Sequence, residues 1–174
     1  MTSKNPEGAK ERMRRHRRIE SVSVLGAVAR LSPLAFHRYA TDFLRATEAV
    51  EPSDHPFSPV ASYLASRTIE LALKAFLSAR GYTFEQLARE PLGHHLDALL
   101  REAQQNGLSE HVRLDDASVA EVVSASRYYS EKVLEYPSVW EALNGYPDKP
   151  QPFVLLRTAR TLVLGLEKPC LDAT

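Results

Sequence analysis

The stretch from Pro59 to Arg80 constrains the fold of this chain more than any other part of the sequence. Ser58 and Pro59 form a typical helix start, and Gly81 is a typical stop. A helix that is apolar nearly all round its circumference is found in the middle of a bundle. We therefore expect a central helix of about 22 residues, roughly 33 Å long, with other helices packed around it. Its apolar side chains are Val60, Tyr63, Leu64, Ile69, Leu71, Leu73, Phe76 and Leu77.

The other periodic stretches also repeat at 3.6 residues, and caps, prolines and glycines separate them. A chain of 174 residues is expected to form one domain. We predict an all-α, four- to five-helix, up-down bundle over residues 19–168. Residues 19–30 are either a short first helix or an extended lead-in, and a C-terminal tail follows from Pro169 onward. The further helices are expected over residues 33–50, a short segment capped by Thr83 and Gln86, and residues 92–106, 116–136 and 152–168.

Residues 1–18 form a basic N-terminal arm. They hold seven Lys and Arg residues against two acidic ones, a net charge of +5, which leaves 15 basic and 20 acidic residues in the rest of the chain. The arm has almost no apolar residues, so we expect it to be disordered. It either contacts the phosphates of RNA or DNA or serves only as a solubilising segment, and the sequence favours neither alternative.

Several classes of protein are disfavoured by composition. The single cysteine, Cys170, allows no internal disulfide and no cysteine-based zinc cluster, which fits a cytoplasmic protein. Neither a membrane-spanning segment nor a signal peptide is expected. No Gly-rich phosphate loop, Ser-His-Asp order or paired catalytic carboxylates stand out, so no metal and no cofactor is predicted.

A narrow polar seam interrupts the apolar surface of the central helix. Glu70 and Lys74 are four residues apart in the favourable order for an ion pair. A largely buried charged pair is costly unless it is satisfied. The seam is therefore either the wall of a groove open to water or ligand, or a stripe of ordinary solvent-exposed residues. Its members are Ser66, Arg67, Glu70, Lys74 and Ser78.

The helix predicted over residues 116–136 offers a second polar feature. Arg127 lies at the border of its apolar face, where an arginine either snorkels to solvent or presents a planar donor to phosphate or carboxylate. Tyr128 lies in the centre of the charged face. We therefore expect Tyr128 to be exposed, in a dimer contact.

Two linked segments carry a family resemblance. "YLASRTIELALKAFLSARGYTFEQL" (residues 63–87) followed by "LGHHLDALLREAQQNGL" (residues 92–108) resembles the HEPN superfamily of small helical bundles. The resemblance implies a bundle of four or five helices that often dimerises. Some HEPN members are metal-independent ribonucleases of toxin–antitoxin or phage-defence systems, and others are inert binding modules.

Active ribonucleases of this superfamily carry an arginine and a histidine with four to six residues between them, and the pair acts at the RNA 2′-OH and the scissile phosphate. Here Arg89 precedes His94 and His95 at such spacings, and Arg30 precedes His37. A motif this short matches readily by chance. The later Arg127 has no histidine after it, which is a departure from the family pattern.

His94 and His95 are expected in the first turn of the helix over residues 92–106, where neighbouring side chains point about 100° apart. They therefore cannot hold one metal ion together. A neutral His94 suits either a general base or a structural bond to Glu70 or Tyr63. We expect His95 to be the exposed member of the pair.

The leading functional hypothesis is a noncatalytic or degenerate HEPN-like module that binds RNA, a nucleotide or a protein partner such as an antitoxin in an inter-helical groove. Lys74 and Arg127 would meet phosphate, His94 would bond a ribose or base, and Glu70 would orient Lys74. A homodimer is expected.

Two alternatives stay open. One is a metal-independent endoribonuclease that uses Arg89 or Arg127 with His94. The other is a pure assembly protein, in which Tyr128 and Trp140 mark the interface, although Trp140 at the end of the bundle is more simply a plug for its core.

Overall fold

The computed structural model describes residues 32–50, 57–136 and 139–173, and within these ranges it is all-α, with seven α-helices, one short 3₁₀ helix and no strand. The predicted arm over residues 1–18 and the ambiguous residues 19–30 lie outside the described ranges. The helices are α2 (Pro33–Val50), α3 (Pro59–Ala79), α4 (Phe84–Ala88), α5 (Leu96–Gln105), α6 (Asp116–Ser130), α7 (Val139–Asn144) and α8 (Pro152–Asp172), with the 3₁₀ helix at Leu108–Glu110.

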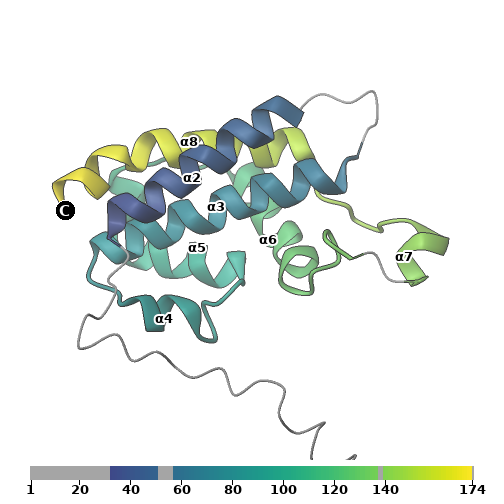
Figure 1. The fold of residues 1–174 in the computed structure, drawn as a ribbon, viewed down its shortest axis with the longest axis horizontal. Helices are drawn as coiled ribbons and strands as arrows, with labels where there is room; N and C mark the ends of the chain where they lie inside the picture. Colours follow the sequence, from purple (N-terminus) through teal and green to yellow (C-terminus); the bar gives the residue numbers. More distant parts are fainter. Residues whose placement is uncertain (1–31, 51–56, 137–138, 174) are drawn as a thin grey trace, which may run out of the picture.

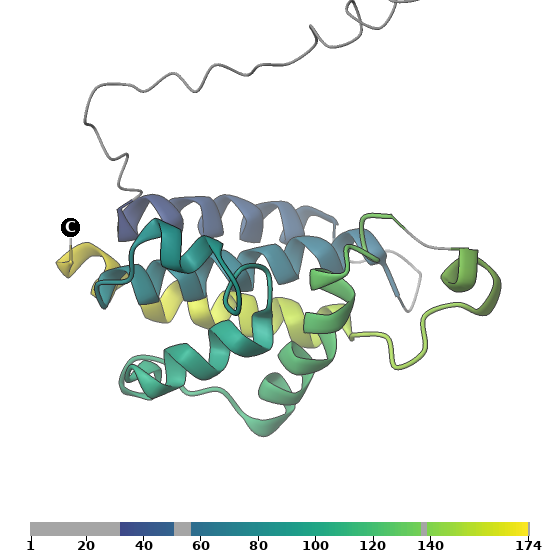
Figure 2. The same ribbon diagram turned by 90° about the horizontal axis from the view of Figure 1, so that it is seen from below.

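The long helix α3 is the centre of the bundle, as its sequence predicts. The side chains of Ile69, Leu73, Phe76 and Leu77 are completely buried. Helix α2 and helix α8 pack along it, and α5 and α6 cover its other side (Figure 1). Helix α2 runs opposite to α3 and α8, whereas α3 and α8 lie side by side and run the same way (Figures 1 and 2). The all-α helical bundle of the prediction is thus present in the described residues.

The helix starts predicted from capping residues are largely confirmed. Ser58 accepts a hydrogen bond from the Ala61 amide at 3.2 Å, and Ser32 accepts one from Ala35 at 3.2 Å. Thr83 and Gln86 form the reciprocal capping box that opens α4. Helix α6 is capped by Asp115, whose side chain accepts a hydrogen bond from the Ser118 amide at 2.8 Å.

Two predicted helix ends are wrong. Helix α6 ends at Ser130 and not at residue 136, and Lys132 shortly after it has a positive φ of 59°. Helix α8 continues through Pro169 to Asp172, so the expected C-terminal tail is helical for most of its length. Pro169 costs the helix one hydrogen bond, but the extra turn completely buries Cys170. That burial offsets the cost.

The helix predicted from Leu92 starts later, at Leu96, with His95 as its N-cap residue. Residues 90–94 form turns, and Gly93 has a positive φ of 20° that a helix interior does not adopt. His94 therefore lies in a turn and not on a helix. The 100° angle between neighbouring side chains of a helix therefore does not apply to His94 and His95.

Helix α7 stands apart from the other helices, and the chain from Gly145 to Lys149 returns from it to the bundle (Figures 1 and 2). The returning part is anchored: the Tyr128 hydroxyl donates to the Pro147 carbonyl, and the Phe57 and Tyr146 rings lie 4.8 Å apart. The predicted role of Trp140 as a plug for the bundle end is wrong, because α7 does not cover the core. Tyr128 is 5% exposed, so the prediction that it is exposed is also wrong.

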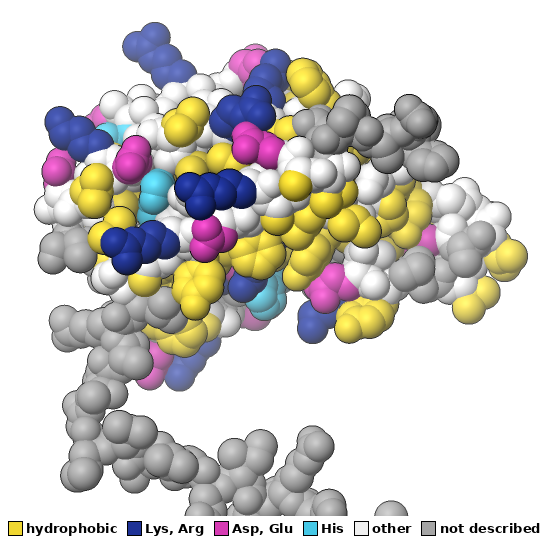
Figure 3. Space-filling model, turned by 45° about the horizontal axis from the view of Figure 1, so that its top comes forward, with side chains coloured by type: hydrophobic (Ala, Val, Ile, Leu, Met, Phe, Trp, Pro, Cys, Tyr) yellow, Lys and Arg dark blue, Asp and Glu magenta, His cyan; other side chains and the backbone are white. Residues whose placement is uncertain are grey.

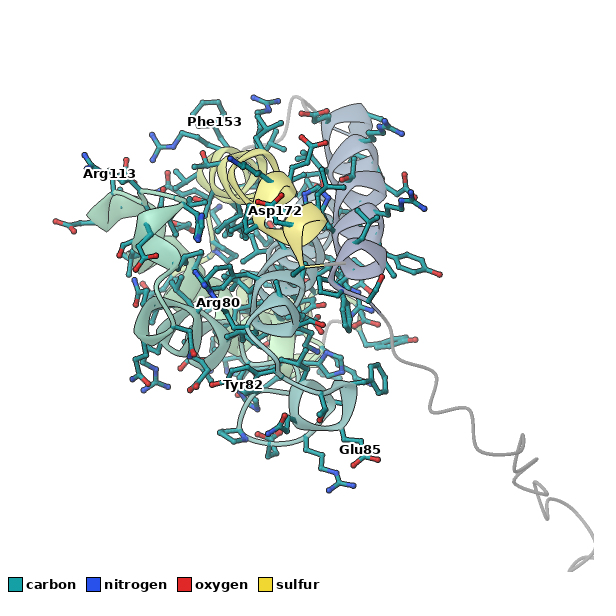
Figure 4. All side chains as sticks on the ribbon, turned by 90° about the vertical axis from the view of Figure 1, so that its left-hand side faces the viewer. Arg80, Tyr82, Glu85, Arg113, Phe153 and Asp172 are labelled. Atoms are coloured by element: carbon teal, nitrogen blue, oxygen red, sulfur yellow. The ribbon has the colours of Figure 1, made fainter. Side chains whose placement is uncertain are left out.

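The view along the bundle separates its two sides. Phe153 and Asp172 lie on α8 on one side, and Glu85 lies on α4 on the other (Figure 4). Arg80 and Tyr82, at the end of α3 and in the loop that follows, lie between these two sides. Helix α4 and the turn that follows it thus bring residues 84–94 against the side of α3 that faces away from α8.

Candidate functional site

The carboxylate of Glu70, in the middle of α3, is the centre of the site. Glu70 is 1% exposed, yet its two oxygens collect several polar partners. Lys74 Nζ donates to Oε1 at 2.6 Å, and Arg67 Nη1 donates to Oε2 at 2.8 Å. The Tyr129 hydroxyl of α6 also donates to Oε2. The predicted Glu70–Lys74 pair is therefore present, and it belongs to a larger network.

His94 completes the network from the turn before α5. Its Nδ1 lies 3.2 Å from Glu70 Oε1, and its ring meets that of Tyr129 edge-on with centroids 6.3 Å apart. The side chain of His94 is nevertheless 58% exposed. A carboxylate only accepts hydrogen bonds, so this contact favours a proton on Nδ1 and leaves Nε2 as the free ring nitrogen.

The charges of the network shift its pKa values. Burial by itself would raise the pKa of the Glu70 carboxyl, but the neighbouring Lys74 ammonium and Arg67 guanidinium outweigh it and lower that pKa. Burial and the negative charge of Glu70 both raise the pKa of the Tyr129 hydroxyl. Glu70 is thus ionised and Tyr129 neutral at neutral pH.

A cavity of about 240 Å³ opens beside this network, between α2, α3 and α4. Its lining combines charged and apolar side chains. The Phe36 and Phe84 rings are stacked in the apolar wall, 6.4 Å apart and 17° from parallel, and Phe84 is 49% exposed. The lining residues are Phe36, Arg67, Glu70, Leu71, Lys74, Phe84, Leu87, Ala88 and His94.

Three of the four predicted ligand-binding residues therefore come together. Glu70, Lys74 and His94 line one cavity together with Arg67, whereas the seam residues Ser66 and Ser78 do not line it. Arg127 is not part of it: its side chain is 73% exposed, lies over the Tyr128 ring and has Glu131 at 3.9 Å. Arg89 is also outside, 75% exposed and 3.8 Å from Glu85. Neither arginine lines the cavity.

The histidines are distributed differently from the prediction. His94 is the exposed member of the pair, while His95 is half-buried and lies 3.2 Å from Glu90. His37 is buried and its Nε2 lies 2.8 Å from the Val163 carbonyl oxygen, so it acts as a structural bond between α2 and α8. Its predicted partner Arg30 lies outside the described residues.

Arg67 and Tyr129 are the site residues that sequence reasoning did not assign to the site. Arg67 belongs to the polar seam, but the i, i+4 pair drew attention to Lys74 instead. Tyr129 is 5% exposed, and its ring packs in the core. A buried tyrosine hydroxyl needs a partner, and this was the signal that could have linked α6 to Glu70.

Two features were looked for among the described residues: a metal-binding cluster and a membrane-spanning helix. No group of three or more His, Cys, Asp and Glu residues there is placed to hold a metal ion. None of the helices within the described ranges combines the length and apolarity that a bilayer crossing requires.

Comparison of the chain with protein-family models, with curated proteins and with solved structures finds no match. The resemblance to the HEPN superfamily therefore stays a prediction from the quoted segments.

The network predicts a specific dependence of stability on acid. Glu70→Gln leaves Lys74 buried without its counter-charge, so we expect the free energy of unfolding at pH 7 to fall by about 3–5 kcal/mol. Since the folded pKa of Glu70 lies below the unfolded value of about 4.3, its stabilisation is present above the unfolded pKa and is lost as the pH falls through the folded pKa. The difference between wild type and variant therefore shrinks in acid.

Urea unfolding between pH 7 and pH 3 measures this difference. Glu131→Gln is the control, because the Glu131 side chain is 60% exposed. Tyr129→Phe, which removes a single donor, should cost about 1.5–3 kcal/mol and should fold even if Glu70→Gln does not. If the free energies of unfolding of Glu70→Gln and of wild type change with pH in parallel, Glu70 is not the ionised carboxylate that stabilises the fold, and the assignment is wrong.

Proposed function

We propose that this protein is a noncatalytic HEPN-like binding module that takes a nucleotide unit into the cavity beside Glu70. One observation carries the proposal: a preformed cavity is lined both by the stacked Phe36 and Phe84 rings and by nitrogen groups of Arg67, Lys74 and His94. Stacked Phe36 and Phe84 suit the face of a base. Lys74, Arg67 and His94 suit phosphate and ribose oxygens.

The geometry favours binding over pure assembly. An assembly protein would be expected to tie Glu70, Lys74 and His94 together with no open space beside them. Here the same residues are tied together and also line a cavity, with His94 58% exposed. The buried network holds the cavity wall in place before a ligand arrives, which reduces the entropy that binding must offset.

Binding of adenosine 5′-monophosphate, measured by isothermal titration calorimetry, tests the proposal. Phe84→Ala removes exposed ring surface from the cavity and should weaken binding about fivefold or more, because stacking on one base contributes roughly 1–3 kcal/mol. Phe153→Ala is the matched control: Phe153 is 68% exposed on α8, on the other side of the bundle (Figure 4). His94→Ala should also weaken binding.

If the nucleotide does not bind at millimolar protein and ligand concentrations, the proposal is wrong. If Phe84→Ala and Phe153→Ala weaken nucleotide binding equally, the nucleotide does not bind in this cavity, and the proposal is also wrong.

A second candidate function rests on the orientation of His94. Its Nδ1 faces the Glu70 carboxylate, as in sites where a carboxylate orients a histidine base. The free Nε2 could then take the proton of an RNA 2′-OH, with Arg67 at the phosphate in place of the predicted Arg89 or Arg127. This is the arrangement that a metal-independent endoribonuclease of the toxin or phage-defence type would need.

RNA cleavage in EDTA separates this candidate from the binding module. The endoribonuclease predicts cleavage by wild type that is reduced at least a hundredfold in His94→Ala while circular dichroism remains unchanged. The noncatalytic module predicts no cleavage by either protein. His95→Ala is the control, since His95 does not line the cavity.

We also propose that the chain forms a homodimer through the segment that leaves the bundle. Tyr136, Val139 and Leu143 are 73%, 77% and 79% exposed, and a helix as short as α7 is not stable without packing. The hydrophobic side chains on one face of the molecule continue in a band toward this projecting end (Figure 3). A second copy packed on the segment would bury them.

Sedimentation equilibrium checks the dimer. Leu143→Asp should shift the protein to monomer, whereas Leu164→Asp, on an exposed position of α8, should not. A wild-type protein that is monomeric at 100 µM, roughly the range of weak complexes, contradicts the proposal.

A further inference from the structure

A second cavity of about 250 Å³ adjoins the first one. It lies between α2, α3 and the end of α6. Arg67 and His94 line both cavities, so the two spaces meet at these residues. The remaining residues of the second cavity are Phe43, Tyr63, Tyr129, Ser130, Lys132 and Glu135.

The two cavities resemble each other in chemistry. The first has the stacked Phe36 and Phe84 rings, and the second has Tyr63 and Tyr129 rings with centroids 5.9 Å apart. Each therefore offers aromatic surface to a flat ring. Each alone is smaller than the roughly 300 Å³ at which ordinary ligand pockets begin, and the two together exceed it.

The junction between the cavities is cationic. Arg67 uses one nitrogen, Nη1, for its bonds to Glu70 and Tyr129, and no other described residue bonds its Nε or Nη2. His94 likewise has no described partner at Nε2. An anionic group at the junction would therefore meet the free donors of Arg67, while Nε2 of a neutral His94 would accept a hydrogen bond from a ribose hydroxyl.

The net charge of the two cavities limits the ligand. Three cations (Arg67, Lys74 and Lys132) and two carboxylates (Glu70 and Glu135) line them, a net charge of +1 with neutral histidine. A single negative charge balances this lining. A triphosphate with its several charges would leave the ligand charge largely unpaired.

We infer that the ligand is a dinucleotide unit: two bases, one in each cavity, joined by one phosphodiester that lies against Arg67 and His94. The inference rests on the proposed function and deepens it. The unit is either a free dinucleotide or two consecutive nucleotides of a longer strand, since both present the same two rings and one charge to the site.

Calorimetry with three matched probes tests the inference: adenosine 5′-monophosphate, the dinucleoside monophosphate ApA, and the methylphosphonate analogue of ApA, which keeps both bases but has a neutral linker. We expect ApA to bind at least tenfold more tightly than the mononucleotide, because a second base stacks. The analogue should lose most of that gain, because its linker has no charge to pair with Arg67.

Variants separate the two cavities. Tyr63→Leu should weaken ApA binding about tenfold and leave the mononucleotide unchanged, whereas Phe84→Ala should weaken both. Thermal unfolding confirms that both variants are folded. A hexanucleotide with blocked ends that binds as tightly as ApA identifies a strand as the source, and ApA binding without hexanucleotide binding identifies a free dinucleotide.

The failure of this inference is distinguishable from that of the proposed function. Equal affinities for ApA and the mononucleotide, or no effect of Tyr63→Leu on ApA, overturn the dinucleotide and leave the nucleotide module standing. Absence of binding by every probe overturns both.

Discussion

The ion pairs and hydrogen bonds of Glu70 are the interactions on which the rest of this site depends. A buried carboxylate is costly unless charged or polar donors surround it. Here the compensation comes from α3 itself through Arg67 and Lys74, from α6 through Tyr129 and from the turn before α5 through His94. One side chain therefore contacts three segments of the chain, and removal of any one partner leaves the buried carboxylate with fewer donors.

The same network gives the cavities their shape and charge. Arg67, Lys74 and His94 each contact Glu70, and the same three side chains line the open space of the cavities. Their positions are fixed before a ligand arrives, so binding does not have to order them. A stable apolar core would have been simpler to build at this point of α3, and a buried polar network there is more readily explained by a ligand.

Sequence reasoning could predict the parts that depend on local rules. The caps at Ser32, Ser58 and Thr83, the central position of α3 and the pairing of Glu70 with Lys74 follow from spacing within one helix. It could not predict what depends on tertiary packing. The turn that releases His94 toward Glu70, the burial of Tyr128 and the continuation of α8 through Pro169 each follow from contacts with distant segments. Arg89 fits the Arg–His motif by spacing, but its side chain is 75% exposed and lies outside the cavity, as does that of Arg127 at 73%.

The charge state of Glu70 is the quantity that tests this account most directly. Carboxyl ¹³C chemical shifts of the side chain, followed by NMR from pH 7 to pH 2 and assigned with Glu70→Gln, report its titration. The account predicts a midpoint clearly below about 4.3, the value of an unperturbed glutamate side chain. A midpoint at or above the ordinary value would mean that burial outweighs Lys74 and Arg67, and that the network does not hold an ionised carboxylate at the site.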